Sequence, residues 1–191
     1  LDSAIGQCTA GRGDIIMVKP GHAENLAAAA AITSDVAGVA VVGLGAGSLR
    51  PKFSWTAATA DWNITANNLS FYNIEFQANF ADVASGIDVS GVTGLTFDSC
   101  YFTEAGTDLN WVDVMDFATG AADIHFVNCR FIGGDASNDS FITGVDFNGL
   151  YIKDCYFASN VAQTAAVGLI ETSGNATNVW IDGCAFRSNI D

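Results

Sequence analysis

The sequence predicts an all-β protein that folds as a single-stranded, right-handed parallel β-helix with a short N-terminal capping segment. We expect three strands per rung and about six rungs. Two observations favour this fold: a short pattern recurs at steps of 26 to 30 residues, and no apolar run of helical period reaches ten residues. The steps are also too short for a propeller blade, which needs about 40 residues and four strands.

The recurring pattern has the form apolar-x-apolar-x-x-(Cys or aliphatic)-x-Phe, with a two-residue corner in its middle. Because side chains alternate faces along a strand, each copy predicts two short strands joined by a tight bend. The clear copies begin at Leu69, Leu95, Ile124, Leu150 and Val179, and a weaker copy begins at Val39. The second corner residue is always of a type that tolerates left-handed backbone or bonds to its own backbone. These residues are Asn73, Ser99, Asn128, Asp154 and Gly183.

Stacked rungs place equivalent residues about 4.8 Å apart in columns. The alternation predicts that the last position of each copy points inward, which gives a buried aromatic stack. Its members are Phe76, Phe102, Phe131, Phe157 and Phe186. A second inward column holds thiols that we expect to stay free and to pack as small apolar groups. Its members are Cys100, Cys129, Cys155 and Cys184.

Each step also has room for a third strand, which we expect at 62–64, 87–89, 115–117, 145–147 and 170–172. The middle residue of four of these strands is acidic and points outward. The predicted acidic column is Asp88, Asp116, Asp146 and Glu171. Stacked carboxylates repel one another and attract cations, and calcium is the candidate because it prefers oxygen ligands. The alternative is a solvated acidic face with loosely held counter-ions, and we expect no other cofactor.

Two further outward columns are rich in aromatic and basic residues. The first runs through Ser70, Thr96, His125, Tyr151 and Trp180, and the second runs through Glu75, Tyr101, Arg130, Tyr156 and Ala185. Tyr, Trp and Arg concentrate in subunit interfaces, so these columns predict an interface between chains. The alternative is a surface that stacks sugar rings. The candidate residues for either role are Tyr101, His125, Arg130, Tyr151, Tyr156 and Trp180.

The chain divides into an N-terminal cap and entry strand over 1–34 and the β-helix over 35–191. From its N-terminus, the first part contains a short helical turn, a Gly-Asp turn, the strand 15–18 and Pro20-Gly21. A glycine-rich segment that ends at Pro51 follows. This order resembles the entry of pectin-lyase-like right-handed β-helix proteins, and it looks most like the tail-spike, fibre or head-decoration proteins of tailed phages. The resemblance covers nearly the whole chain and implies a fold, because its motifs specify no activity.

The end of the sequence follows a complete copy of the repeat, with only five residues after Phe186. An open rung exposes apolar core and unpaired strand edges, and a solenoid needs a polar cap there. We therefore expect either that the chain continues or that a neighbouring subunit covers this end.

The formal charge of −14 argues against nucleic acid as a partner, and no apolar stretch is long enough to predict membrane insertion. No set of acids is required to converge, and His22 and His125 have no nucleophile beside them, so we expect no catalytic residues. The function expected is a non-enzymatic structural protein of a phage virion. Its partners would be further copies, with a homotrimer favoured, other virion proteins and a cell-surface glycan. The alternatives are a polysaccharide lyase or glycoside hydrolase acting on an extended glycan and, third, an extracellular bacterial adhesin.

Overall fold

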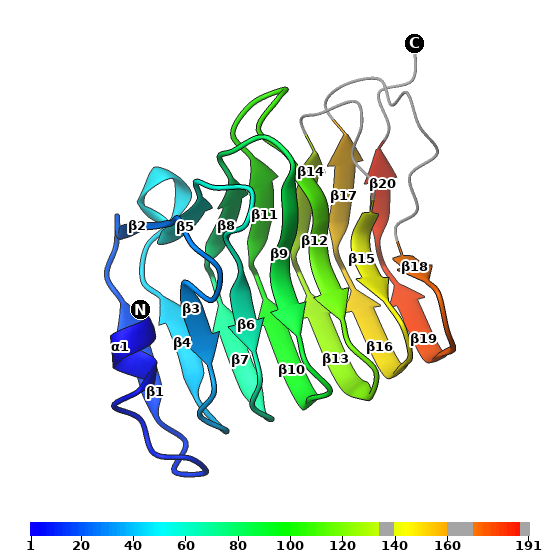
Figure 1. The fold of residues 1–191 in the computed structure, drawn as a ribbon, viewed down its shortest axis with the longest axis horizontal. Coiled ribbons are helices and arrows are strands. Elements are labelled where there is room, and N and C mark those ends of the chain that lie inside the picture. The colour runs from blue at the N-terminus through cyan, green and yellow to red at the C-terminus, as the bar shows by residue number, and fades with distance from the viewer. Residues whose placement is uncertain (134–139, 160–169, 188–191) are drawn as a thin grey trace.

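The chain winds through three parallel sheets as a β-solenoid, seen in a computed structural model that describes residues 1–133, 140–159 and 170–187 (Figure 1). Each full turn contributes one strand to each sheet, which confirms the predicted all-β parallel solenoid with three strands per rung and about six rungs. All pairings between the named strands are parallel, because each strand pairs with its equivalent one turn away.

The three sheets are called A, B and C in the order in which the chain first enters them. Sheet A has seven strands: β1 (Ile15–Val18), β4 (Ala40–Gly43), β7 (Leu69–Tyr72), β10 (Thr93–Asp98), β13 (Ala121–Val127), β16 (Phe147–Lys153) and β19 (Ala176–Asp182). Sheet B has seven: β2 (Ala23–Leu26), β5 (Lys52–Trp55), β8 (Glu75–Ala78), β11 (Tyr101–Glu104), β14 (Arg130–Gly133), β17 (Tyr156–Ser159) and β20 (Ala185–Arg187). Sheet C has six: β3 (Ile32–Ser34), β6 (Trp62–Ile64), β9 (Val83–Val89), β12 (Trp111–Phe117), β15 (Ser140–Gly144) and β18 (Ile170–Thr172).

The solenoid begins at β1 and not at residue 35. β1, β2 and β3 pair with β4, β5 and β6, so they form a complete first turn. The repeat pattern does not include this first turn, because the corner and inward positions of the turn carry residue types that differ from those of the later copies. The next turn is also irregular, because the short 3₁₀ helix η1 (Gly47–Leu49) lies between β4 and β5 where later turns have a two-residue corner.

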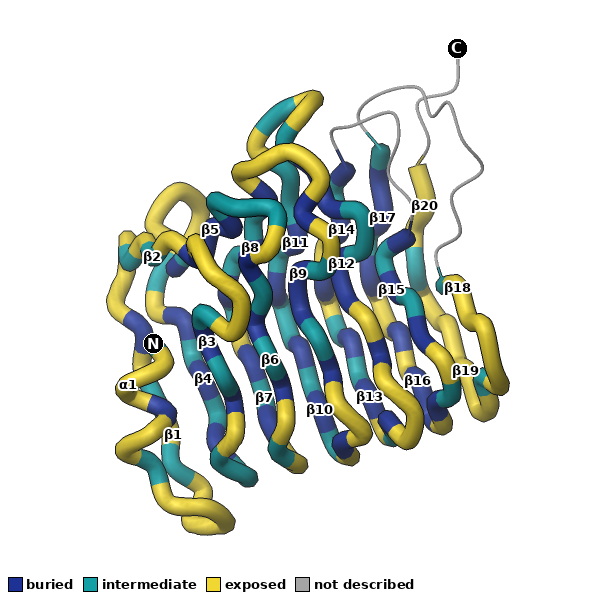
Figure 2. Tube along the Cα trace, viewed as in Figure 1, coloured by how far each residue is buried: buried dark blue, intermediate teal, exposed yellow. Residues whose placement is uncertain are grey.

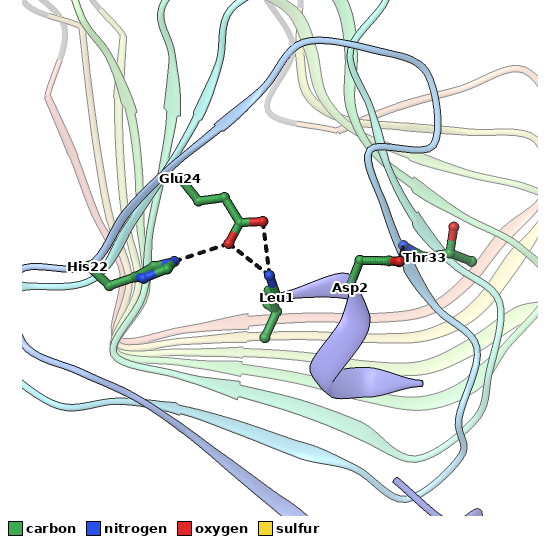
Figure 3. Close-up of polar contacts among 5 residues, drawn as sticks. All are labelled: Leu1, Asp2, His22, Glu24 and Thr33. Atoms are coloured by element: carbon green, nitrogen blue, oxygen red, sulfur yellow. Dashed lines mark hydrogen bonds and ion pairs between the residues drawn. The ribbon is translucent and has the colours of Figure 1, made fainter. Parts of the chain in front are cut away.

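The N-terminal end of the solenoid is covered by the one-turn helix α1 (Asp2–Ile5), whose Ile5 is buried in the core. Two polar contacts fix the helix, as Figure 3 shows. The Asp2 carboxylate accepts a 2.9 Å bond from the amide of Thr33 in β3. The Leu1 ammonium donates to both oxygens of Glu24, at 2.9 and 2.8 Å, and His22 lies 3.0 Å from the same carboxylate. Helix α1 therefore covers the core at this end and bonds to the edge of β3.

The predicted phenylalanine column is confirmed as a stack, but the prediction that all its members are buried is wrong for Phe186, which is 61% exposed. The rings are in register from turn to turn and stack almost parallel, with centroids 5.0, 4.6, 4.6 and 5.2 Å apart through Phe76, Phe102, Phe131, Phe157 and Phe186. Phe53 in β5 extends the column by one turn. A second inward column stacks Phe71, Phe97 and Phe126, and its rings meet the first column edge to face. The buried members of both columns belong to one continuous core. Figure 2 shows buried positions recurring along the strands of successive turns.

The corners between sheets A and B adopt the predicted left-handed backbone. The φ angles of the corner residues are positive at Asn73, Ser99, Asn128, Asp154 and Gly183. At the first of these corners the Asn73 amide donates to the carbonyls of Gly43 and Gly45, both at 2.8 Å. A Cβ at Gly43 would lie against the Asn73 carbonyl, so the glycine-rich segment before Pro51 serves close packing.

The third strand of the fifth turn differs from the prediction. The strand expected at 145–147 is β15 (Ser140–Gly144), because Ile142 pairs with Met115 and Ile170 and is fully buried. Val145 is instead 44% exposed, and Phe147 opens the next strand of sheet A. Both segments alternate apolar and polar residues, so periodicity alone does not separate them.

Truncating one ring of the phenylalanine column will test its contribution to stability. Phe102→Ala removes a fully buried side chain stacked between two rings, and we expect a loss of about 3–5 kcal/mol in the free energy of unfolding. The matched control Phe80→Ala removes a ring that is 43% exposed and will cost less than about 1 kcal/mol. Urea denaturation of both variants measures the difference, and equal losses would contradict the assigned core.

Candidate functional site

The outward face of sheet A carries the first predicted aromatic column. Register places His125, Tyr151 and Trp180 above one another on β13, β16 and β19. The rings of His125 and Tyr151 stack at 4.6 Å with an interplanar angle of 22°. The exposed fraction rises from 37% at Tyr151 to 64% at Trp180. The column therefore presents aromatic surface to solvent in the last turns.

A polar column runs beside it, two residues further along the same strands. Its polar members are Lys153 and Asp182, and apolar Val127 precedes them in register on β13. The two columns border a groove of about 320 Å³ that includes side chains of both. Neither Lys153 nor Asp182 was predicted to belong to a site. The signal that could have found them is the alternation along each strand, which turns them outward two residues after Tyr151 and Trp180.

The second predicted column lies on sheet B, so the six candidate residues form two surfaces and not one. Its side chains alternate between cations and rings and contact one another. The Arg50 guanidinium carbon lies 3.8 Å from the centre of the Tyr101 ring. Arg130 lies 5.5 Å from the Tyr101 ring and 5.2 Å from the Tyr156 ring. These cation–π contacts occupy ring faces within the chain itself.

The acidic column on sheet C has three acids among its last four positions and not four. Asp88 pairs with Asp116, Thr143 follows, and Glu171 is next. The prediction that Asp146 belongs to this column is wrong, because β15 ends before it. The Asp146 carboxylate instead accepts a 2.6 Å bond from the amide of Asn175 in the neighbouring turn.

Asp88 has an altered titration. Burial raises the pKa of its carboxyl, the hydrogen bond from Ser85 opposes this effect, and the nearby charges of Asp61 and Asp116 raise it further. Within the described ranges no group of three or more His, Cys, Asp or Glu side chains is placed to hold a metal ion. Calcium binding by the acidic column remains an untested prediction.

The cysteine column is buried in the core at Cys100, Cys129 and Cys155, whereas Cys184 is partly buried, and all five cysteines of the chain are free thiols. The Sγ of Cys129 lies 3.4 Å from the carbonyl of Phe97, and that of Cys155 lies 3.5 Å from the carbonyl of Phe126. Burial raises the pKa of the Cys129 thiol, and its contact with Cys129 raises the pKa of the Cys155 thiol. Because the thiolate is the reactive form, these residues are suited to packing and not to nucleophilic chemistry.

Comparisons with protein-family models, with curated proteins and with solved structures gave no match for this chain. Over the residues that the structure describes, none of the helices is long and apolar enough to cross a membrane.

Replacing Asp88 will change the pH dependence of stability. The pKa of the Asp88 carboxyl is higher in the folded state than its usual value of 3.8, so between these two pKa values the native chain binds more protons than the unfolded chain. The free energy of unfolding therefore falls as the pH rises from 3.8 through the folded-state pKa. Asp88→Asn keeps the Ser85 hydrogen bond acceptor and removes the charge. We expect a gain of up to about 1 kcal/mol at neutral pH and none near pH 3, where both states are protonated.

Urea denaturation at the two pH values measures this effect. The exposed Asp108→Asn is the control and will show no such pH-dependent gain. A destabilised Asp88→Asn protein at neutral pH, or the same gain at both pH values, would contradict the role assigned to burial of Asp88.

Proposed function

We propose that this protein is a non-enzymatic structural subunit of a tailed-phage virion, serving in capsid decoration, in a fibre or in attachment. The resemblance of its entry and repeat to β-helix structural proteins of such phages supports this assignment. The continuous stack of rings through the core supports it too, because close-packed interiors resist compression and suit a mechanical part.

The single observation that carries the proposal is the exposed last turn. Ile181 and Phe186 occupy inward positions, yet they are 43% and 61% exposed. Their equivalents one turn earlier, Ile152 and Phe157, are 0% and 3% exposed. Figure 2 shows this contrast along β19 and β20. Exposed apolar groups of this kind mark contact surfaces between proteins.

The edges of the last strands add a second driving force for association. β18, β19 and β20 are the terminal strands of their sheets, so one side of each offers backbone groups for pairing. The opposite end of the solenoid is covered by α1. We propose that the last turn is covered either by a continuation of the chain or by a neighbouring subunit, which would be a further copy in a homotrimer or another virion protein.

The mass of the native protein will test this proposal. Native mass spectrometry or light scattering of the wild-type chain at about 10 µM will give a multiple of 19.9 kDa, with the trimer favoured. The double variant Ile181→Ser and Phe186→Ser removes the exposed apolar groups and will give a monomer that keeps its β-sheet circular dichroism.

The matched control is Phe80→Ser with Leu44→Ser, two apolar residues of similar exposure away from the last turn, at 43% and 40%. This control will keep the wild-type mass. A wild-type monomer, or an unchanged assembly in the last-turn variant, counts against the proposal.

One observation favours the alternative of a glycoside hydrolase. Asp88 and Asp116 are neighbours on sheet C, one rung apart, and two carboxyls about 5 Å apart are the arrangement of retaining enzymes. The raised pKa of Asp88 is also the property of a general acid. Release of reducing ends from neutral or acidic polysaccharides, abolished by Asp88→Asn and by Asp116→Asn, would establish this alternative in place of the structural role.

A further inference from the structure

We propose that the outward face of sheet A across β13, β16 and β19 is a binding site for an uncharged saccharide. The site lies between the aromatic column of His125, Tyr151 and Trp180 and the polar pair of Lys153 and Asp182. It adds a ligand to the proposed structural role, and it does not depend on how the chains assemble.

The aromatic surface of this strip is free to take a ligand. Trp180 is the most exposed large apolar side chain of its sheet apart from Met17, and Tyr151 lies directly below it. The rings of Tyr101 and Tyr156 on sheet B have instead a guanidinium over them. The face of an aromatic ring is electron-rich and attracts the polarised C–H groups of a sugar ring. One face of Tyr151 stacks on His125, so it is mainly the Trp180 ring of sheet A that offers to a ligand the contact that sheet B uses within the chain.

Polar groups of the right kind stand beside the rings. The Lys153 ammonium and the Asp182 carboxylate are exposed, and in the described part of the chain neither takes part in an ion pair. An ammonium donates hydrogen bonds and a carboxylate accepts them, so the two together match neighbouring hydroxyl groups, each of which does both. Ligand sites commonly combine aromatic walls with a few polar groups in this way.

The charge of the site indicates an uncharged ligand. Lys153 and Asp182 balance each other, and the ring of His125 is hydrogen-bonded to Asp123 at 2.8 Å. The chain as a whole has a formal charge of −14, which repels an anionic glycan at longer range. The volume of about 320 Å³ falls in the range of small-ligand clefts, about 300 to 1,000 Å³.

The site also remains open in an assembled solenoid. His125, Tyr151 and Trp180 point away from the core, whereas the assembly surface consists of the inward residues and strand edges of the last turn. A rung stacked on β19 would add one more outward residue to the column. The strip would then become longer without being closed.

Titration with defined neutral oligosaccharides tests the proposal. The probes are maltohexaose, cellohexaose and mannohexaose, each measured by isothermal calorimetry and by tryptophan emission up to about 10 mM. Trp55, Trp62 and Trp111 are buried and Trp180 is exposed, so a change in emission reports on the proposed site. We expect at least one probe to bind with a dissociation constant of about 1 mM or lower and to shift the emission to shorter wavelength.

Variants of the strip identify the site. Tyr151→Ala and Trp180→Ala will each weaken calorimetric binding by about tenfold or more, and Lys153→Met will weaken it several-fold. The matched control Tyr72→Ala removes an exposed ring of the same sheet that lies outside the groove, and it will leave the affinity unchanged. An oligogalacturonate of the same length will not bind.

Three results would overturn the proposal: no binding of any neutral probe, binding unaffected by Tyr151→Ala and Trp180→Ala, or binding of the anionic oligomer alone. The native mass of each variant is measured in parallel. If no probe binds and substitutions in the strip dissociate the assembly, the strip is a subunit interface and not a saccharide site. Because mass and binding are read separately, failure of this site is distinguishable from failure of the assembly role.

Discussion

Parallel backbone hydrogen bonding between successive turns is the interaction on which this structure depends. It holds equivalent residues about 4.8 Å apart, so each inward position becomes a column whose members must stack. Flat phenylalanine rings satisfy this spacing, and they do so with interplanar angles of 6° to 9° through the main column. The left-handed corners at Asn73, Ser99 and their equivalents give the later turns the same sharp bend between sheets A and B.

The same constraint makes the two ends of the solenoid different. A stacked array has neighbours for every turn except the first and the last, so each terminal turn needs a cover of another kind. Helix α1 supplies that cover at one end, with Ile5 in the core and Asp2 bonded to the edge of β3. At the other end Ile181 and Phe186 are 43% and 61% exposed, although they occupy inward positions.

The outward positions are free of the stacking requirement, and they distinguish one surface of the molecule from another. On sheet B the cations and rings satisfy one another, with Arg50 reaching Tyr101 from the long corner before β5. On sheet A the rings of Tyr151 and Trp180 meet solvent beside the charged groups of Lys153 and Asp182. On sheet C carboxylates lie side by side, and partial burial of Asp88 alters its titration.

The repeat in the sequence was sufficient to determine the parallel solenoid, its corners and the phenylalanine and cysteine columns, because regular spacing converts directly into vertical alignment. Tertiary structure decided what the linear pattern left ambiguous. The segments 140–144 and 145–147 both alternate apolar and polar residues, so either could form the third strand of the fifth turn. Ile142 is buried and pairs with Met115, so the strand is β15 and Asp146 lies outside the acidic column. Which outward columns share a face was also decided in three dimensions, because the bend at each corner separates residues that lie only a few positions apart in the chain.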